Sequence, residues 1–152
     1  MRRIAVLCCS AAAVVGCAKN ESRAPEASQT APPPPAIALA DVAGKWTVRG
    51  MNEARDTTLV TYELTATADT TGWMIKFANG RTVPAHVAAV AGDSVVMDAG
   101  PYESVLRRGV QVTTHGMFRL QAGKIVGLTV AHYRTTGPDS VRRIATEGTR
   151  TP

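Results

Sequence analysis

Histidines are the residues of this 152-residue sequence best suited to acid–base chemistry or to metal binding. There are three of them, His86, His115 and His132. Metal sites often take two ligands from positions two or four residues apart, and no two of these histidines have that spacing. His115 also falls on the polar phase of an alternating segment, so we expect it to be solvated. The spacing therefore predicts that the chain has no metal site.

His132 is the histidine whose direction the sequence leaves open. It shares the phase of Val126 and Leu128, which would turn it inward. The opposite phase, which includes Ala131 and Tyr133, is equally apolar. An inward His132 would be either a hydrogen-bonded core residue or a polar contact to a ligand.

A serine nucleophile is the next candidate chemistry. Gly92-Asp93-Ser94 is similar to the G-D-S sequence around the nucleophile of one group of esterases. That chemistry needs a histidine base oriented by a carboxylate, and no Asp-x-x-His follows near the C-terminus. A turn between two strands explains the same residues. Since no acid pair, phosphate loop or nucleophile elbow is found elsewhere, we predict that the protein has no catalytic residues and no cofactor, and is not an enzyme.

The N-terminus carries a targeting signal. Met1-Arg2-Arg3 is basic, and the apolar run at 4–15 is too short to cross a bilayer, which takes about 20 residues. Val14-Val15-Gly16-Cys17 resembles a bacterial lipobox. The resemblance implies that residues 1–16 are cleaved and that Cys17 carries lipid. The alternative is an uncleaved core helix, but no polar face breaks the run.

This resemblance has consequences for location and for disulfides. Ala18 after the cysteine resembles the sorting pattern for the outer membrane, which implies a lipid-anchored protein of the cell envelope, on the periplasmic face of that membrane. The other two cysteines, Cys8 and Cys9, lie in the segment that is removed. The mature chain would therefore have no disulfide and would be stabilised by its core alone.

Residues 17–40 form a polar linker that ends in four prolines, Pro32 to Pro35. Such a stretch buries too little apolar area to fold, and a proline run favours an extended spacer. A proline run is also a possible ligand for an aromatic groove. On a lipid anchor, we interpret the segment as a disordered tether.

Composition excludes one class of partner. Aromatic residues make up only 5% of the chain, too few for a surface that stacks bases, and the formal charge of +5 includes the two arginines of the signal. Once these are removed the bias is mild. We therefore predict no nucleic-acid binding.

From Asp41 to the C-terminus, apolar and polar residues alternate with a period of two, interrupted by turn residues. Asn79-Gly80 is the strongest hairpin signal in the chain. Nine short strands are expected, at 45–49, 60–67, 73–77, 83–90, 94–98, 102–107, 111–120, 124–134 and 140–146. The pattern predicts an all-β, antiparallel up-and-down meander over residues 41–152 that closes into a small barrel of eight or nine strands.

Gly44-Lys45-Trp46, on the first strand, resembles the G-x-W signature of the lipocalin and wider calycin barrels. In that family the tryptophan plugs the closed end of the barrel and an arginine of the last strand packs over it. The resemblance implies this role for Trp46 and for Arg142 or Arg143. An ordinary core tryptophan is the alternative interpretation of Trp46.

Two functions follow, and the inward side chains should distinguish them. In the first, the barrel of a lipocalin-like lipoprotein binds a small apolar ligand. In the second, a filled barrel docks an envelope protein through its outer surface. The candidate ligand contacts are Tyr62, Trp73, Phe77, Phe118 and His132. Several small residues are also expected to point inward, and they indicate either room for a ligand or a narrow, tightly filled barrel. They are Ala66, Ala85, Ala89, Gly116 and Gly127. Arg107-Arg108 and Arg142-Arg143 are expected at solvated hairpin ends, or facing acidic headgroups or a peptide.

Overall fold

The computed structural model of the chain describes residues 36–152. The predicted signal peptide, the predicted lipidation site Cys17 and nearly all of the predicted linker lie outside the described residues. The described part begins with contacts to the barrel: the amide of Ile37 donates to the carbonyl of Gly92 at 2.8 Å, and Val42 at the end of the short helix α1 (Leu39–Val42) is fully buried. The folded domain thus takes in residues before Asp41, where the sequence predicts its start.

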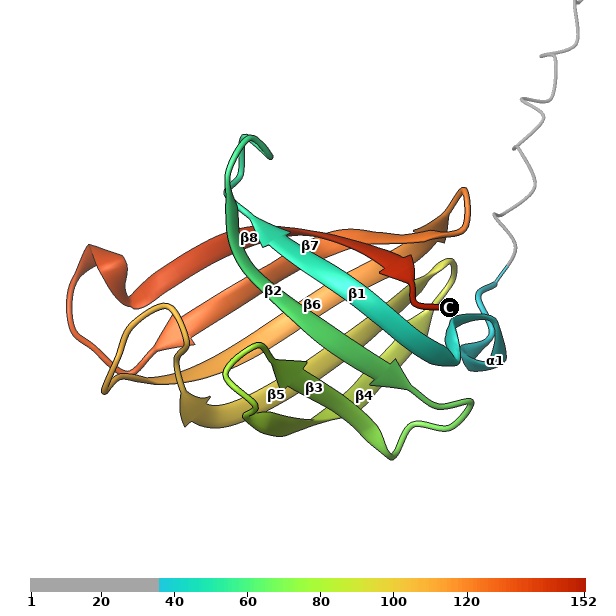
Figure 1. Cartoon of the computed structure of the whole chain (residues 1–152), viewed down its shortest axis with the longest axis horizontal. Coiled ribbons are helices and arrows are strands. Elements are labelled where there is room, and N and C mark those ends of the chain that lie inside the picture. Colours follow the sequence, from blue (N-terminus) through green and yellow to red (C-terminus); the bar gives the residue numbers. More distant parts are fainter. Residues whose placement is uncertain (1–35) are drawn as a thin grey trace, which may run out of the picture. The chain divides into compact units, whose positions relative to one another are not determined.

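Eight antiparallel strands follow one another around a closed barrel (Figure 1). Each strand pairs with the next in the chain, and β8 pairs with β1. The predicted all-β meander is confirmed. The strands are β1 (Gly44–Met51), β2 (Thr58–Ala66), β3 (Trp73–Phe77), β4 (Thr82–Ala91), β5 (Ser94–Glu103), β6 (Gln111–Gln121), β7 (Lys124–Tyr133) and β8 (Val141–Arg150), with a 3-10 turn η1 (Pro138–Ser140) before β8.

The two-residue alternation decides which face of each strand lies inside. In β1, Trp46, Val48 and Gly50 are buried, whereas Thr47 and Arg49 between them are exposed. An open antiparallel sheet with this pattern would bury one face and still leave two unpaired edges. Closure of β8 on β1 removes both edges.

The hairpin predicted at Asn79-Gly80 is confirmed, and it joins β3 to β4. Gly80 has φ +81°, a conformation that glycine adopts without strain, and its amide donates to the carbonyl of Phe77 at 2.9 Å. The side-chain oxygen of Asn79 accepts a hydrogen bond from the amide of Arg81 at 3.0 Å. Local turn chemistry therefore fixes the register of these two strands.

The prediction of a separate strand at 102–107 is wrong, which is why the barrel has eight strands and not nine. Gly100, with φ +112°, sits at a register shift between Ala99 and Tyr102, so β5 bends there without ending. The chain leaves the sheet at Ser104, whose hydroxyl accepts hydrogen bonds from the amides of Leu106 and Arg107, both at 3.1 Å. These bonds form a turn, and residues 104–110 become a loop.

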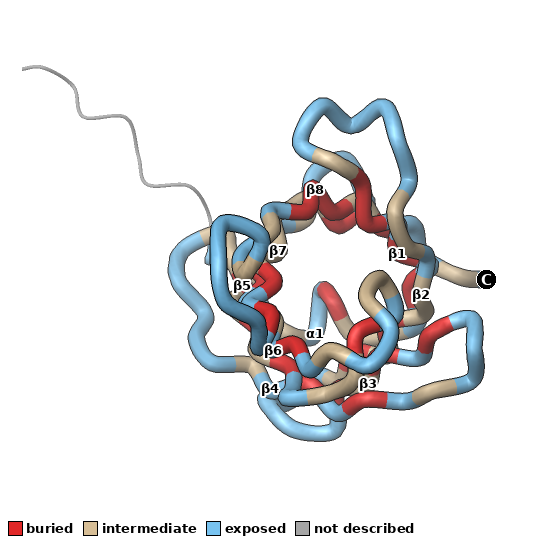
Figure 2. The backbone as a smooth tube through the Cα atoms, turned by 90° about the vertical axis from the view of Figure 1, so that its left-hand side faces the viewer, coloured by how far each residue is buried: buried red, intermediate tan, exposed pale blue. Residues whose placement is uncertain are grey.

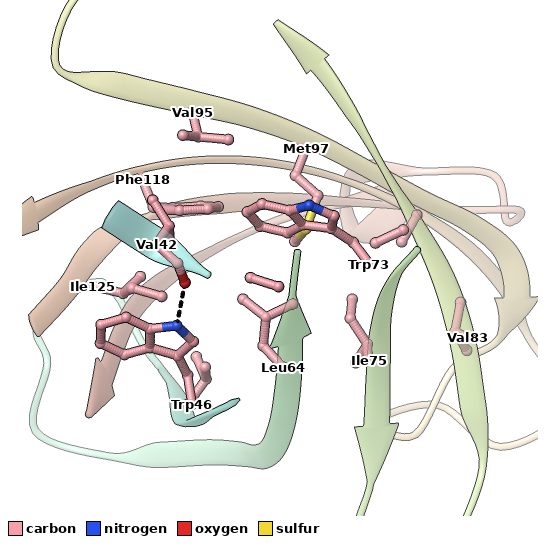
Figure 3. Packing of buried hydrophobic residues seen from close by; sticks show 14 of the residues in the cluster. Val42, Trp46, Leu64, Trp73, Ile75, Val83, Val95, Met97, Phe118 and Ile125 are labelled. Atoms are coloured by element: carbon pink, nitrogen blue, oxygen red, sulfur yellow. Dashed lines mark hydrogen bonds between the residues drawn. The ribbon is translucent and has the colours of Figure 1, made fainter. Parts of the chain in front are cut away.

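One end of the barrel is closed by Trp46 and α1. The indole nitrogen of Trp46 donates to the carbonyl of Val42 at 2.8 Å, and both residues are essentially inaccessible to solvent (Figure 3). This end is filled by bulky side chains, here called the closed-end core. Its members are Val42, Trp46, Leu64, Trp73, Val95, Phe118 and Ile125.

The arginine that packs over Trp46 is Arg150, and the predicted choice of Arg142 or Arg143 is wrong. The guanidinium carbon of Arg150 lies 4.4 Å from the centre of the Trp46 ring, and its Nη2 donates to the carbonyl of Asp41 at 2.8 Å. Arg142 and Arg143 start the same strand, at the opposite end of the barrel. Arg143 points outward and pairs with Glu53 at 3.2 Å.

The Gly44-x-Trp46 spacing has a physical reason in this arrangement. Gly44 has φ +131°, and a β-carbon at this position would lie 2.6 Å from Nη1 of Arg150. That nitrogen donates to the carbonyl of Ala43 at 2.5 Å. Glycine is therefore required both by the backbone and by the close approach of the arginine that covers Trp46.

Trp46 and Arg150 should be energetically coupled. Trp46→Ala removes a buried ring and should lower the free energy of unfolding by about 3–5 kcal/mol. Arg150→Ala should lower the free energy of unfolding by less, about 1–3 kcal/mol. The double variant should lose less than the sum of the two single losses, since each single substitution already removes the contact between the two residues. Urea titrations of the four proteins measure the coupling. Arg142→Ala is the control and should add to Trp46→Ala; additivity with Arg150 would contradict the contact.

Candidate functional site

The other end of the barrel contains a cavity of about 60 Å³, here called the open-end cavity. Figure 2 views the barrel from this end, where the loops 52–57, 78–81, 104–110 and 134–140 lie. Among residues 36–152, no charged side chain lines the cavity. The lining residues are Gly50, Val60, Tyr62, Ile75, Phe77, Met97, Tyr102, Ser104, Val105, Leu106, Val112, Thr114, Gly116, Thr129, Ala131, Tyr133, Ile144 and Thr146.

Aromatic rings form one wall of this cavity. The rings of Tyr62 and Phe77 lie 5.9 Å apart in an edge-to-face arrangement, and those of Phe77 and Tyr102 lie 5.6 Å apart. Both distances are typical of favourable aromatic pairs. Tyr62 and Phe77 are two of the five ligand contacts predicted from the sequence, so these two do line the cavity.

The polar groups of the lining are partly paired with one another. The hydroxyls of Thr129 and Thr146 lie 3.1 Å apart, and the hydroxyl of Thr114 donates to the carbonyl of Ala99 at 3.4 Å. The phenol oxygens of Tyr62 and Tyr133 make no hydrogen bond to another described side chain. Since no fully buried polar side-chain atom of residues 36–152 lacks a partner, these two oxygens are not fully buried. These two hydroxyls are thus free to hydrogen-bond a molecule in the cavity.

Burial raises the pKa of two tyrosines of the cavity, Tyr62 and Tyr102. Removal of the phenol from water raises the pKa of Tyr62, and Tyr102 nearby adds to the effect. Burial likewise raises the pKa of Tyr102. Both phenols therefore stay protonated, and able to donate a hydrogen bond, to a higher pH than an exposed tyrosine.

The loop 104–110, here called the mouth loop, lies over the open-end cavity. Ser104, Val105 and Leu106 contribute to its lining. The guanidinium of Arg107 lies 4.2 Å from the centre of the Tyr133 ring, and Nη1 donates to the carbonyl of Asp139 at 2.8 Å. Arg107 thereby joins the mouth loop to the loop between β7 and β8.

Two predicted ligand contacts lie in the closed-end core and not in the open-end cavity. Trp73 is fully buried, and its indole nitrogen donates to the carbonyl of Asp69 at 2.7 Å. Its ring packs against Phe118, with 6.0 Å between the ring centres. A period of two shows that a residue points inward but not at which end of the barrel it lies, so the sequence could not separate them from Tyr62.

His132 faces outward, and its prediction as a ligand contact is wrong. Ala131 and Tyr133 on either side of it are buried, whereas His132 is exposed. The phase of Val126 and Leu128 is thus the outer one, even though it is apolar. β7 is apolar on both faces, and that is why its alternation did not indicate a direction.

Two of the three histidines, His86 and His115, lie on either side of Asp98 on the outer face. His86 is opposite Asp98 in the register of β4 and β5, and Asp98 is opposite His115 in that of β5 and β6. Nδ1 of His115 lies 2.5 Å from Oδ1 of Asp98. Among residues 36–152 no three His, Cys, Asp or Glu side chains are arranged to hold a metal ion.

Gly92-Asp93-Ser94 is the turn between β4 and β5. Gly92 has φ +57°, and the hydroxyl of Ser94 donates to the carboxylate of Asp93 at 2.8 Å. The side chains of His86, His115 and His132 point outward from their strands, and within residues 36–152 none of them hydrogen-bonds to Ser94. The turn accounts for all three residues.

The small inward residues have different roles. A β-carbon at Gly127 would overlap the carbonyl oxygen of Met117, so this glycine marks tight filling. At Gly116 the nearest atom would be Oγ1 of Thr129, at 3.3 Å, on the side of the open-end cavity. Ala89 is exposed and follows a register shift in β4, so its predicted inward direction is wrong.

Three residues of the site were not predicted from the sequence: Tyr102, Tyr133 and Arg107. Tyr133 shares the phase of Ile125 and Ala131, which are apolar. The opposite phase of this strand is equally apolar, so the alternation did not indicate that Tyr133 points inward. Tyr102 lies beyond a bend in β5, which shifts its phase relative to Met97. Arg107 comes from a loop, for which alternation gives no information.

No family model, curated protein or solved structure matches this chain. The lipocalin-like interpretation therefore rests on this chain's own strand order and on the contacts of Trp46 with Arg150. Within residues 36–152, no helix has both the length and the apolar character needed to cross a bilayer.

Alkaline pH should destabilise the fold through Tyr62. Its pKa is raised above the ordinary value of 10.0, so its contribution to stability is complete below pH 10 and is lost as the pH rises above that value. Urea titrations between pH 8 and pH 11 should show wild type losing more stability than Tyr62→Phe. Parallel curves for the two proteins would mean that the phenol is as solvated in the folded as in the unfolded state.

Proposed function

We propose that the protein is a membrane-anchored, exported lipoprotein whose lipocalin-like barrel binds one small, mainly apolar molecule in the open-end cavity. The observation that carries this proposal is the asymmetry of the interior. One end is filled by the closed-end core, whereas the other keeps a space of about 60 Å³ between apolar and aromatic side chains. An eight-stranded barrel is just wide enough to hold such a ligand.

The size of the cavity limits the ligand. Pockets for drug-sized molecules have about 300–1,000 Å³, and about 10–15 Å³ is enough for one water. With about 60 Å³, the open-end cavity takes a compact molecule or one short chain. A larger ligand would require displacement of the mouth loop, whose Val105 and Leu106 cover the space.

The chemistry of the lining supports a ligand with an apolar body and few polar atoms. The lining holds no charged side chain, so a charge inside would be buried without a partner. The free hydroxyls of Tyr62 and Tyr133 can donate to a carbonyl, ether or carboxylate oxygen of the ligand.

A filled barrel that docks an envelope protein is the second candidate. The outer face carries an apolar row in register, Val96 on β5, Met117 on β6 and Leu128 on β7, and Met117 is 52% exposed. Apolar side chains gathered on an outer face support a protein partner. The small size of the open-end cavity favours the filled barrel. The lining of the cavity, which is uncharged and has hydroxyls without a hydrogen-bond partner, favours ligand binding.

Filling the cavity separates the two candidates. Ala131 lines the cavity and Ala85 lies in the filled part of the core, so Ala131→Val should fill space whereas Ala85→Val should overpack and cost about 1–3 kcal/mol. Native mass spectrometry of wild type isolated from its own envelope should show the added mass of a bound ligand. The Ala131→Val variant should lack this added mass, whereas the Ala85→Val variant should keep it. Absence of any added mass in wild type, with an intact partner complex instead, would support the filled barrel.

The anchor is tested separately through Cys17. If Cys17 carries lipid, Cys17→Ser should move the protein from the membrane fraction to the soluble exported fraction, because two or more acyl chains are what hold such a protein on a bilayer. Ala18→Ser, which keeps the cysteine, is the control and should stay with membranes. Membrane fractionation of Cys17→Ser like that of wild type would overturn the lipoprotein proposal.

A further inference from the structure

The basic residues of the barrel are distributed unequally between its two ends. The open end, taken as residues 52–57, 78–81, 103–110 and 134–143, carries all of the excess positive charge of residues 36–152. It has seven arginines, Arg55, Arg81, Arg107, Arg108, Arg134, Arg142 and Arg143, and four acids, Glu53, Asp56, Glu103 and Asp139. The rest has six basic and six acidic residues, Lys45, Arg49, Lys76, Arg119, Lys124 and Arg150 with Asp41, Glu63, Asp69, Asp93, Asp98 and Glu147.

The acids of the open end are largely engaged. Glu53 pairs with Arg143 at 3.2 Å, and Glu103 pairs with Arg81 at 2.9 Å. Asp56 accepts hydrogen bonds from the side chains of Asn52 and Thr57, which lower its pKa. Arg107, Arg108, Arg134 and Arg142 form no ion pair with an acid of the described chain.

Arg107 is the one of these four that the structure ties to the cavity. It stacks over Tyr133, whose ring lines the cavity, and it is half-buried in the mouth loop. Stacking occupies the flat face of the Arg107 guanidinium, and its Nη1 donates a hydrogen bond to the carbonyl of Asp139. The remaining N–H groups are in the planar arrangement that recognises carboxylate and phosphate oxygens.

We propose that the ligand is an anionic amphiphile, with a short apolar body in the open-end cavity and a single carboxylate or phosphate held at the mouth by Arg107. This inference rests on the proposed function and adds the charge of the ligand to it. The anion stays at the mouth because the cavity lining has no charge to pair with it, whereas the surrounding arginines attract it from solution. Arg142 is half-buried at the start of β8, opposite the cavity residue Ala131, and is a candidate for a second contact.

Matched ligands test the charge. Residues 17–152 with Cys17→Ser, prepared without ligand, would be titrated by calorimetry with hexanoate, hexyl phosphate, 1-hexanol and hexylamine at low and at high salt. The two anions should bind at least tenfold more tightly than the alcohol, and the amine most weakly. Added salt should reduce the difference, and the better of the two anions identifies the headgroup.

Matched variants test the residue. Arg107→Gln should bring the affinity for hexanoate down to that for 1-hexanol and leave 1-hexanol unchanged, whereas Arg107→Lys, which keeps the charge but not the planar group, should lie between. Arg108→Gln, an exposed neighbour with the same change of charge, should alter hexanoate affinity less than threefold. Thermal unfolding of each variant checks that it is folded.

Each other outcome is informative. Equal affinities for hexanoate and 1-hexanol, or an Arg107→Gln variant that weakens both alike, would overturn the inference and leave ligand binding standing. An equal loss in Arg107→Gln and Arg108→Gln would also overturn it, since the effect would then come from net charge and not from this contact. Failure of all four ligands to bind wild type would overturn the proposed function itself.

Discussion

The closure of one barrel end by Trp46 is the constraint from which the rest of the interior follows. The indole ring is held from three sides: its nitrogen donates to Val42 of α1, Arg150 covers its face, and the closed-end core packs beneath it. Because Arg150 also donates to the carbonyls of Asp41 and Ala43, the same guanidinium ties α1 to the last strand. Access to the interior is thereby left to the opposite end.

The two halves of the interior differ in the size and polarity of their inward side chains. The closed half combines two tryptophans with leucine, isoleucine and phenylalanine, which pack together around Trp46 and Trp73 (Figure 3) and leave only about 10 Å³ of space beside Leu64 and Phe118. The open half places Gly50, Gly116, Ala131 and several threonines opposite tyrosine rings, so volume is left between them. The cavity results from which residues share a level of the barrel, since the same eight strands run through both halves.

The outer face is organised by the same register that fills the interior. Closure brings residues far apart in sequence to one level, as with His86, Asp98 and His115 on β4, β5 and β6. Ion pairs link neighbouring strands in the same way: Glu147 on β8 contacts Lys124 on β7 at 3.3 Å and Arg49 on β1 at 3.4 Å, and these cations lower the pKa of its carboxyl. Most of the outward residues of β7 differ from these charged positions: they are apolar although they do not pack in the barrel interior.

The roles expected of Gly44 and Trp46 came from the resemblance of Gly44-Lys45-Trp46 to the calycin signature. The sequence could predict the all-β meander and the Asn79-Gly80 hairpin, because they depend on a period of two and on local turn chemistry. It could not determine that Arg150, and not Arg142 or Arg143, covers Trp46, since that depends on which end of β8 reaches the closed end. It could not orient His132, because both phases of β7 are apolar. Nor could it separate Tyr62 and Phe77 from Trp73 and Phe118: all four point inward, and only the closed barrel, with its fixed levels, decides which of them meet a cavity and which are packed solid.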